Sequence, residues 1–107
     1  MTTECMTSVQ VLDDGVELTL VELCRASRAG EEQVRLWVLE GVLTPRGAAP
    51  EDWRFAPAAL RRARRARALM QDLEINAAGV ALALDLMDEI EALRASLRRA
   101  GLGLGTP

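Results

Sequence analysis

The longest apolar run of the chain, AAGVALALDLM at residues 77–87, carries one charge, that of Asp85. At 100° per residue, the apolar side chains of this region fall into two groups on nearly opposite sides of a helix. These groups are Leu82, Leu86 and Ile90, and Val80, Leu84 and Met87. A chain of 107 residues is too small to bury both sides alone, and the run is shorter than the roughly 20 residues that cross a bilayer. We therefore expect this helix to pack on its own domain and also on another chain.

A narrow stripe along the same predicted helix indicates self-association. Its residues follow one another at spacings of 4, 4, 3 and 4, which is close to the coiled-coil repeat. They are Leu82, Leu86, Ile90, Leu93 and Leu97. Because the stripe covers barely two heptads, it is too short for an autonomous two-stranded coil. We expect a homodimer in which this helix acts alongside other contacts.

A short strand and a helix are predicted before residue 27. Residues 7–12 alternate as a strand does, and the Asp-Asp-Gly sequence at residues 13–15 is typical of a turn. Thr19 and Glu22 have the spacing of a capping box, in which each side chain accepts a hydrogen bond from the other residue's backbone amide. The helix that follows should run to about Ala26. Its buried side chains are predicted to be Leu20, Leu23 and Cys24.

A second short helix is predicted after a turn at residues 27–30. Glu31 and Glu32 suit the positive first turn of a helix, and Gly41 is a typical C-cap. The side chains expected to be buried are Val34, Trp37 and Val38. Two short helices joined by a tight turn form a helix-turn-helix.

A small hairpin, or wing, is predicted between Leu43 and Phe55. Its tip is GAAPED at residues 47–52. Trp53 and Phe55 should point to the same side of the returning strand, because the side-chain period of a strand is two. Pro57 then opens a third helix at a favoured position.

This third helix has a small apolar face and an arginine face. The apolar face consists of Ala59, Ala63, Ala66 and Met70, and the arginine face of Arg61, Arg62, Arg64, Arg65 and Arg67. After a break near residues 72–75, Asn76 can cap the last helix, which should run to about Arg99. We divide the chain into an N-terminal segment, a winged helix-turn-helix domain, an association helix and a tail expected to be disordered. Their ranges are 1–17, 18–75, 76–100 and 101–107.

The composition favours a mostly α-helical protein without enzymatic chemistry. Only 3% of the residues are aromatic although 50% are hydrophobic, and the chain has no histidine, which excludes histidine triads and imidazole acid–base catalysis. We find no activated nucleophile and no phosphate loop, and we expect no cofactor. Cys5 and Cys24 make a poor metal site, and Cys24 is predicted to be a small core residue. The first residues resemble no secretion signal, so we expect a cytoplasmic protein.

The order of the predicted elements resembles the MerR-like winged-helix superfamily. The residues that carry this resemblance are the T-x-x-E sequence at 19–22, V-R-x-W at 34–37, G-V-L-x-P at 41–45 and the wing aromatic Phe55. Together they cover residues 18–75. The resemblance implies a winged helix-turn-helix with a small β wing.

A second resemblance covers residues 18–98. The W-x-F sequence at 53–55, the arginine-rich helix and the stretch at 72–94 look like the CbpM family of chaperone modulatory proteins, most specifically in AGVALALDLMDEI at 78–90. This resemblance implies that the chain binds the J-domain of a DnaJ-type, CbpA-like co-chaperone and blocks its access to the Hsp70 protein DnaK. It also implies a homodimer through the C-terminal helix. The alternative is a MerR-like transcriptional regulator.

Five residues are candidates for the partner contact. Tryptophan and arginine are enriched in binding hot spots, which favours Trp53 and Arg54, with Phe55 beside them. Asp85 and Asp88 lie on a small-residue face that is complementary to the basic second helix of a J-domain. Alternatively, the two aromatic residues anchor the wing to the domain and Asp85 is an ordinary surface charge.

The predicted reading helix argues against DNA binding. Its outward face offers Glu32, Gln33, Leu36 and Glu40, and the net charge of the chain is −3. A DNA site would therefore depend on arginines, namely Arg35, Arg61, Arg62, Arg64 and Arg65. Alternatively, the arginine face pairs with the acidic N-terminal segment, which carries Glu4, Asp13, Asp14 and Glu17.

Overall fold

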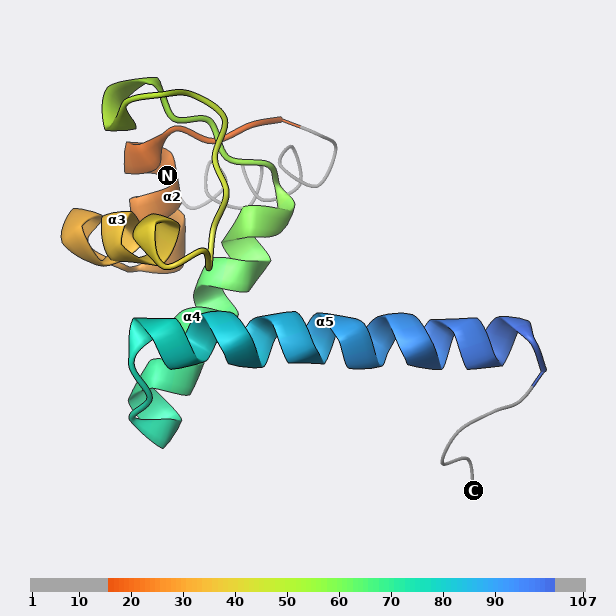
Figure 1. The fold of residues 1–107 in the computed structure, drawn as a ribbon. Coiled ribbons are helices and arrows are strands. Elements are labelled where there is room, and N and C mark those ends of the chain that lie inside the picture. Colours follow the sequence, from red (N-terminus) through yellow and green to blue (C-terminus); the bar gives the residue numbers. More distant parts are fainter. Residues whose placement is uncertain (1–15, 102–107) are drawn as a thin grey trace.

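The computed structural model describes residues 16–101, and the predictions for residues 7–15 and 102–107 lie outside this range. Figure 1 shows a body of short helices from which one long helix projects. The helices are α2 (Leu20–Ser27), α3 (Glu31–Leu39), the 3-10 turn η1 (Pro50–Asp52), α4 (Ala58–Leu73) and α5 (Ala77–Arg99). The predicted order of elements is confirmed.

The capping box at the start of α2 is confirmed. The Thr19 hydroxyl accepts a hydrogen bond from the Glu22 amide at 3.2 Å, and the Glu22 carboxylate accepts one from the Thr19 amide at 2.8 Å. The helix ends one residue later than predicted, at Ser27, whose buried hydroxyl donates to the Leu23 carbonyl at 2.7 Å. Cys24 is only partly buried, so it lies at the edge of the core and not within it.

Helix α3 ends in a Schellman motif built on Gly41. The Gly41 amide donates to the Val38 carbonyl at 3.1 Å, and the Val42 amide donates to the Trp37 carbonyl at 2.8 Å. Gly41 has a φ of 85°, which only glycine adopts without a steric penalty. Val34 and Trp37 are buried as predicted, whereas Val38 is only partly buried.

The wing contains less strand than predicted. It is held by two isolated antiparallel bridges, Leu18 with Phe55 and Arg46 with Arg54, and its tip is the turn η1. The amides of Arg46 and Arg54 each donate to the other residue's carbonyl at 2.9 Å. Gly47 closes the tip at a φ of 113°, where an added Cβ would lie 2.5 Å from the Asp52 carbonyl oxygen.

Helices α4 and α5 cross closely because small residues line the contact. On α4 the buried residues are Leu60, Ala63 and Ala66, so Leu60 was missed by the sequence analysis, while Ala59 and Met70 are only partly buried. Asn76 caps α5 as predicted, since its side chain accepts from the Gly79 amide at 2.8 Å. The buried residues of α5 are Ala77, Val80 and Leu84. All three lie at the start of α5, and the rest of the helix extends away from the body (Figure 1).

Candidate partner-binding site

Arg62 joins three segments of the chain at one point. Its Nε donates to the Val42 carbonyl, its NH2 group to Asp85 at 2.8 Å and its NH1 group to Asp88 at 2.7 Å. The Arg62 side chain is only 23% exposed, whereas those of Asp85 and Asp88 are 69% and 61% exposed. The two carboxylates that were predicted to contact a partner are therefore also paired within the chain, and Arg62 is not available for phosphate. The cause is the crossing of α4 and α5, which no spacing in the sequence indicated.

An open cleft of about 400 Å³ lies beside this acidic cluster of Arg62, Asp85 and Asp88. Its other wall comes from residues 41–44 and from the small side chains Ala56, Ala58 and Ala59. Because each carboxylate uses one oxygen for Arg62, and two carboxylates face one guanidinium, the cluster keeps one excess negative charge. A cleft with small apolar walls and such a cluster can accept one long cationic side chain.

The wing aromatics do not both face outward. Phe55 has 0% of its surface exposed, so we correct the prediction that it contacts a partner directly; it anchors the wing to the core. Trp53 is half-buried and packs edge-on against Phe55, with 6.0 Å between the ring centroids. Arg54 is exposed and donates to the Trp53 carbonyl at 2.8 Å.

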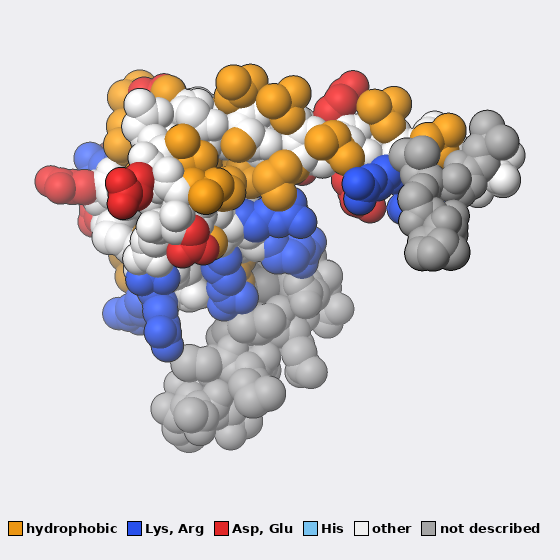
Figure 2. Space-filling view, turned by 90° about the horizontal axis from the view of Figure 1, so that it is seen from below, with side chains coloured by type: hydrophobic (Ala, Val, Ile, Leu, Met, Phe, Trp, Pro, Cys, Tyr) orange, Lys and Arg blue, Asp and Glu red, His pale blue; other side chains and the backbone are white. Residues whose placement is uncertain are grey.

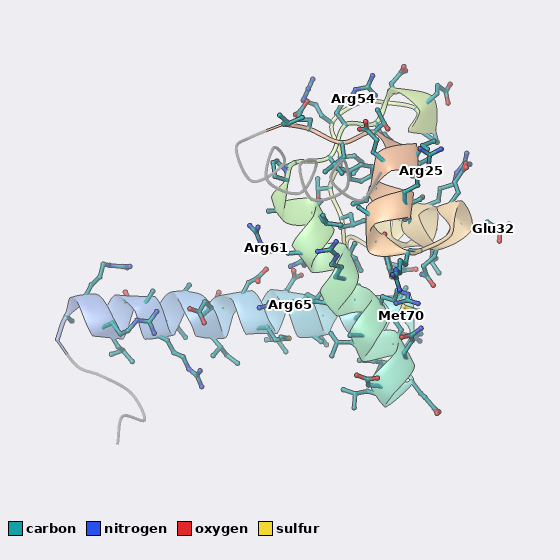
Figure 3. All side chains as sticks on the ribbon, turned by 180° about the vertical axis from the view of Figure 1, so that it is seen from behind. Arg25, Glu32, Arg54, Arg61, Arg65 and Met70 are labelled. Carbon is teal, nitrogen blue, oxygen red and sulfur yellow. The ribbon has the colours of Figure 1, made fainter. Side chains whose placement is uncertain are left out.

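The wing and the acidic cluster are separate regions of the surface. Figure 3 shows Arg54 at the end of the body that is farthest from α5, whereas Arg65 lies close to α5. The structure therefore does not bring Trp53 and Arg54 together with Asp85 and Asp88. A single contact formed by all four residues, as their sequence suggested, is therefore divided into two regions of the surface.

One side of α5 remains uncovered. Leu82, Leu86, Ile90 and Leu93 are between 50% and 62% exposed, whereas Leu97 is partly buried. Val80 and Leu84, on the other side, are buried as predicted, but Met87, which was grouped with them, is exposed. Figure 2 shows hydrophobic side chains following α5 away from the body. We name Leu82, Leu86, Ile90, Leu93 and Leu97 the α5 stripe.

The outward face of α3 is acidic and apolar, as predicted. Glu32, Leu36 and Glu40 are exposed, and Arg35 pairs with Glu31 at 2.7 Å. Leu39 is also strongly exposed, which the sequence analysis missed because it assigned no face to that residue. This face presents carboxylates and an apolar side chain, and its arginine is already paired, so it is poorly suited to bind a polyanion such as DNA.

The arginine face of α4 is partly occupied by contacts within the chain. Besides Arg62, Arg64 donates to the Ala26 carbonyl at 3.2 Å, while the exposed Arg61 and Arg65 lie along α4 in Figure 3. Of the acidic residues expected to pair with this face, Glu17 pairs instead with Arg46 of the wing. The other three lie outside the described residues.

Among residues 16–101, Cys24 is the titratable group whose pKa clearly departs from its ordinary value. Burial, and secondarily the negative charge of Glu31, raise the pKa of the Cys24 thiol above its ordinary value. Between residues 16 and 101 we find no group of three or more histidine, cysteine, aspartate or glutamate side chains that could hold a metal ion. Over the same residues, every helix is too short or too polar to cross a membrane.

Comparison with known proteins first defines the class. The model of a family described as MerR HTH family regulatory protein matches residues 18–100. Similar proteins include the chaperone modulatory protein CbpM of Coxiella burnetii (strain Dugway 5J108-111), which is 36% identical over 88 residues, or 82% of this chain and 83% of that protein. The CbpM of Pseudomonas putida (strain GB-1) is 40% identical over 90 residues, or 82% and 89%. The chain therefore belongs to the CbpM family of chaperone modulatory proteins, within the MerR-type helix-turn-helix fold.

Proposed function

We propose that this protein is a chaperone modulator that binds the J-domain of a DnaJ-type co-chaperone and inhibits it by blocking the access of Hsp70. Membership of a family named for chaperone modulation supports the general role. The acidic cleft beside Arg62, Asp85 and Asp88 is the observation that carries the choice of surface.

The acidic cluster suits a basic helix because its carboxylates are already oriented. Asp85 and Asp88 are three residues apart and therefore lie on one face of α5. Arg62 holds one oxygen of each carboxylate and leaves the remaining acceptors toward solvent. A lysine or arginine of the partner that enters the cleft would neutralise the excess charge without reorganising the cluster.

Trp53 and Arg54 form a second proposed contact on the wing. Trp53 offers a half-exposed ring that is held in place by Phe55, so little side-chain entropy would be lost on binding. Because Trp53 and Arg54 do not line the acidic cleft, each contact can be disrupted without the other.

Inhibition by this arrangement is competitive occlusion. Two ligands that share one surface of the J-domain exclude each other by mass action, so relative affinity and concentration decide the outcome. No conformational signal within the co-chaperone is required.

The test is a titration of a DnaJ-type co-chaperone of the same organism with wild type, Asp88→Lys and Trp53→Ala. We expect Asp88→Lys to weaken binding at least tenfold, because it replaces attraction by repulsion, and Trp53→Ala to weaken it about thirtyfold. Glu89→Lys is the matched control, since Glu89 is the exposed neighbour on α5 outside the cluster. Equal effects of Asp88→Lys and Glu89→Lys would contradict the site, and simultaneous binding of Hsp70 would contradict occlusion.

We further propose that the protein is a homodimer through the α5 stripe. The stripe leaves large aliphatic side chains exposed on a helix that extends beyond the body, and a contiguous apolar surface of this kind marks an interaction site. A second α5 presents the same stripe and is therefore self-complementary.

A transcriptional regulator is the weaker candidate. The structure leaves Arg65 exposed for phosphate but occupies Arg62 and Arg35 with carboxylates. We therefore propose that binding to DNA is weak at physiological salt.

A further inference from the structure

A second cleft, of about 200 Å³, lies between the α2–α3 turn and the C-terminal half of α4. Its apolar lining comes from Trp37 and Met70, and the Trp37 indole donates to the Met70 sulfur at 3.3 Å. Its polar lining includes Arg28 and Gln33 on one side and Arg67 on the other. Met70 is labelled in Figure 3 on the part of α4 that passes α3. This cleft is separate from the acidic cleft.

The polar side chains around this second cleft, which are Arg28, Gln33, Arg67 and Gln71, supply more hydrogen-bond donors than acceptors. Arg28 and Arg67 form no ion pair within residues 16–101, and the Nε2 nitrogen of Gln33 is buried without any hydrogen bond there. The N-cap residue of α3, Gly30, has no side chain that could accept a hydrogen bond, so the first amides of this helix also remain open. A buried amide nitrogen without an acceptor is costly. A Gln33 side chain that turned into the cleft would meet an anionic oxygen there and gain the missing hydrogen bond.

Arg28 is held in a conformation that favours glycine. Its φ of 61° and ψ of 32° are left-handed, at the C-cap of α2 where glycine is the usual residue. Glu74 has the same conformation at the C-cap of α4, so the fold tolerates it, and at Arg28 it places an arginine beside the cleft.

The two glutamates at the start of α3 do not block an anion. Glu31 pairs with Arg35 at 2.7 Å, one turn further along α3. Glu32 is exposed, and in Figure 3 it points away from α4 and Met70. Neither residue lines the cleft.

We propose that this second cleft binds a carboxylate group. The guanidinium groups of Arg28 and Arg67 together can hold the two carboxylate oxygens, and the open amides at the start of α3 supply further donors. The carbon chain that bears the carboxylate would pack on Trp37 and Met70. The volume admits a small organic acid or the C-terminal residue of a peptide, and both share this chemistry.

The experiment is a titration of the ¹⁵N-labelled full chain, observed at the Gln33 amide and the Trp37 indole. The probes are succinate, a short N-acetylated alanine peptide with a free C-terminus, and the same peptide with a C-terminal amide. We expect saturable shifts with at least one carboxylate probe and none with the amide. Succinate alone identifies a small acid as the ligand class, and the free peptide identifies a chain terminus.

Three variants make the result specific. Arg28→Gly removes one guanidinium while relieving the left-handed backbone, so the fold is retained, and Arg67→Gln removes the other. Each should weaken binding about tenfold, because a hydrogen bond to a charged group is lost. Arg65→Gln is the control on the same helix, outside the cleft, and should bind as wild type. Absence of saturable shifts, equal binding of the amide peptide, or equal weakening by Arg65→Gln would overturn the proposal.

Discussion

Arg62 of α4 and Asp88 of α5 form an ion pair of 2.7 Å although 26 residues separate them along the chain. The same guanidinium also binds Asp85 and the Val42 carbonyl, so one side chain ties the wing base and two helices together. The contact holds α5 in the direction in which it leaves the body, and it orients the carboxylates of the acidic cleft.

We predict that Arg62→Leu lowers the free energy of unfolding by about 1–3 kcal/mol, because it removes charge-assisted hydrogen bonds and leaves the Val42 carbonyl without its donor. Urea denaturation followed by circular dichroism measures this. Arg65→Leu, on the exposed side of the same helix, should change stability by less than about 0.5 kcal/mol. Similar losses in both variants would show that Arg62 has no special role.

We predict that Leu86→Glu converts the proposed homodimer into a monomer. Leu86 is 55% exposed on the α5 stripe, and a carboxylate buried there would face its own copy. Light scattering at micromolar concentration measures the mass. Val21→Glu makes the same change at an exposed apolar residue of α2 and should leave the dimer intact. A wild-type monomer, or a Leu86→Glu dimer, would disprove the α5 interface.

Two glycine variants compare the loss of stability caused by backbone strain alone with the loss caused by strain together with a steric clash of the added Cβ. Gly41→Ala should cost about 1 kcal/mol, because φ is positive but nothing lies within 4 Å of the added Cβ. Gly47→Ala should cost more, since its Cβ would also meet the Asp52 carbonyl at 2.5 Å and force the wing tip to open. Thermal unfolding compares the two, and a Gly47→Ala variant as stable as Gly41→Ala would show that the tip adapts freely.

Cys24 should react slowly with thiol reagents at neutral pH. Burial and Glu31 raise the pKa of its thiol, so the thiolate fraction of the folded protein is smaller than that of a free cysteine. The pKa of the Cys24 thiol is higher in the folded than in the unfolded protein. The contribution of this thiol to the free energy of unfolding is therefore fully present at neutral pH and decreases as the pH rises past the ordinary thiol pKa. Reaction rates with iodoacetamide measure this, and Glu31→Gln should accelerate the reaction. A rate equal to that of an unfolded control would contradict the prediction.

Binding to duplex DNA at physiological salt should be no tighter than about 10 µM, within the range of non-specific contacts, because the outward face of α3 is acidic. Fluorescence anisotropy with random and promoter duplexes measures it. The double variant Glu32→Gln and Glu40→Gln should bind more tightly, since it removes two repelling charges. Nanomolar binding of one specific duplex that is lost with Arg61→Gln and Arg65→Gln would favour the transcriptional regulator.

Elements with local signals could be predicted from the sequence. The capping box at Thr19, the Asn76 cap and the Gly41 terminus each depend on neighbouring residues along the chain, and each is confirmed. Helical periodicity alone places Leu82 and Leu86 on the side of α5 opposite to Val80 and Leu84. The structure confirms this, because the first two are exposed and the other two are buried.

Contacts between distant segments were decided by the tertiary structure. Nothing in the spacing of Arg62, Asp85 and Asp88 shows that α4 crosses α5 at these residues, because the crossing depends on how small alanines let the two helices approach. Phe55 and Trp53 are two residues apart and lie on the same side of the wing, so their spacing does not distinguish them. Packing against the core decides that the Phe55 ring is buried and the Trp53 ring half-exposed. The sequence determined which faces exist on each helix; the packing of one helix on another determined which faces remain available.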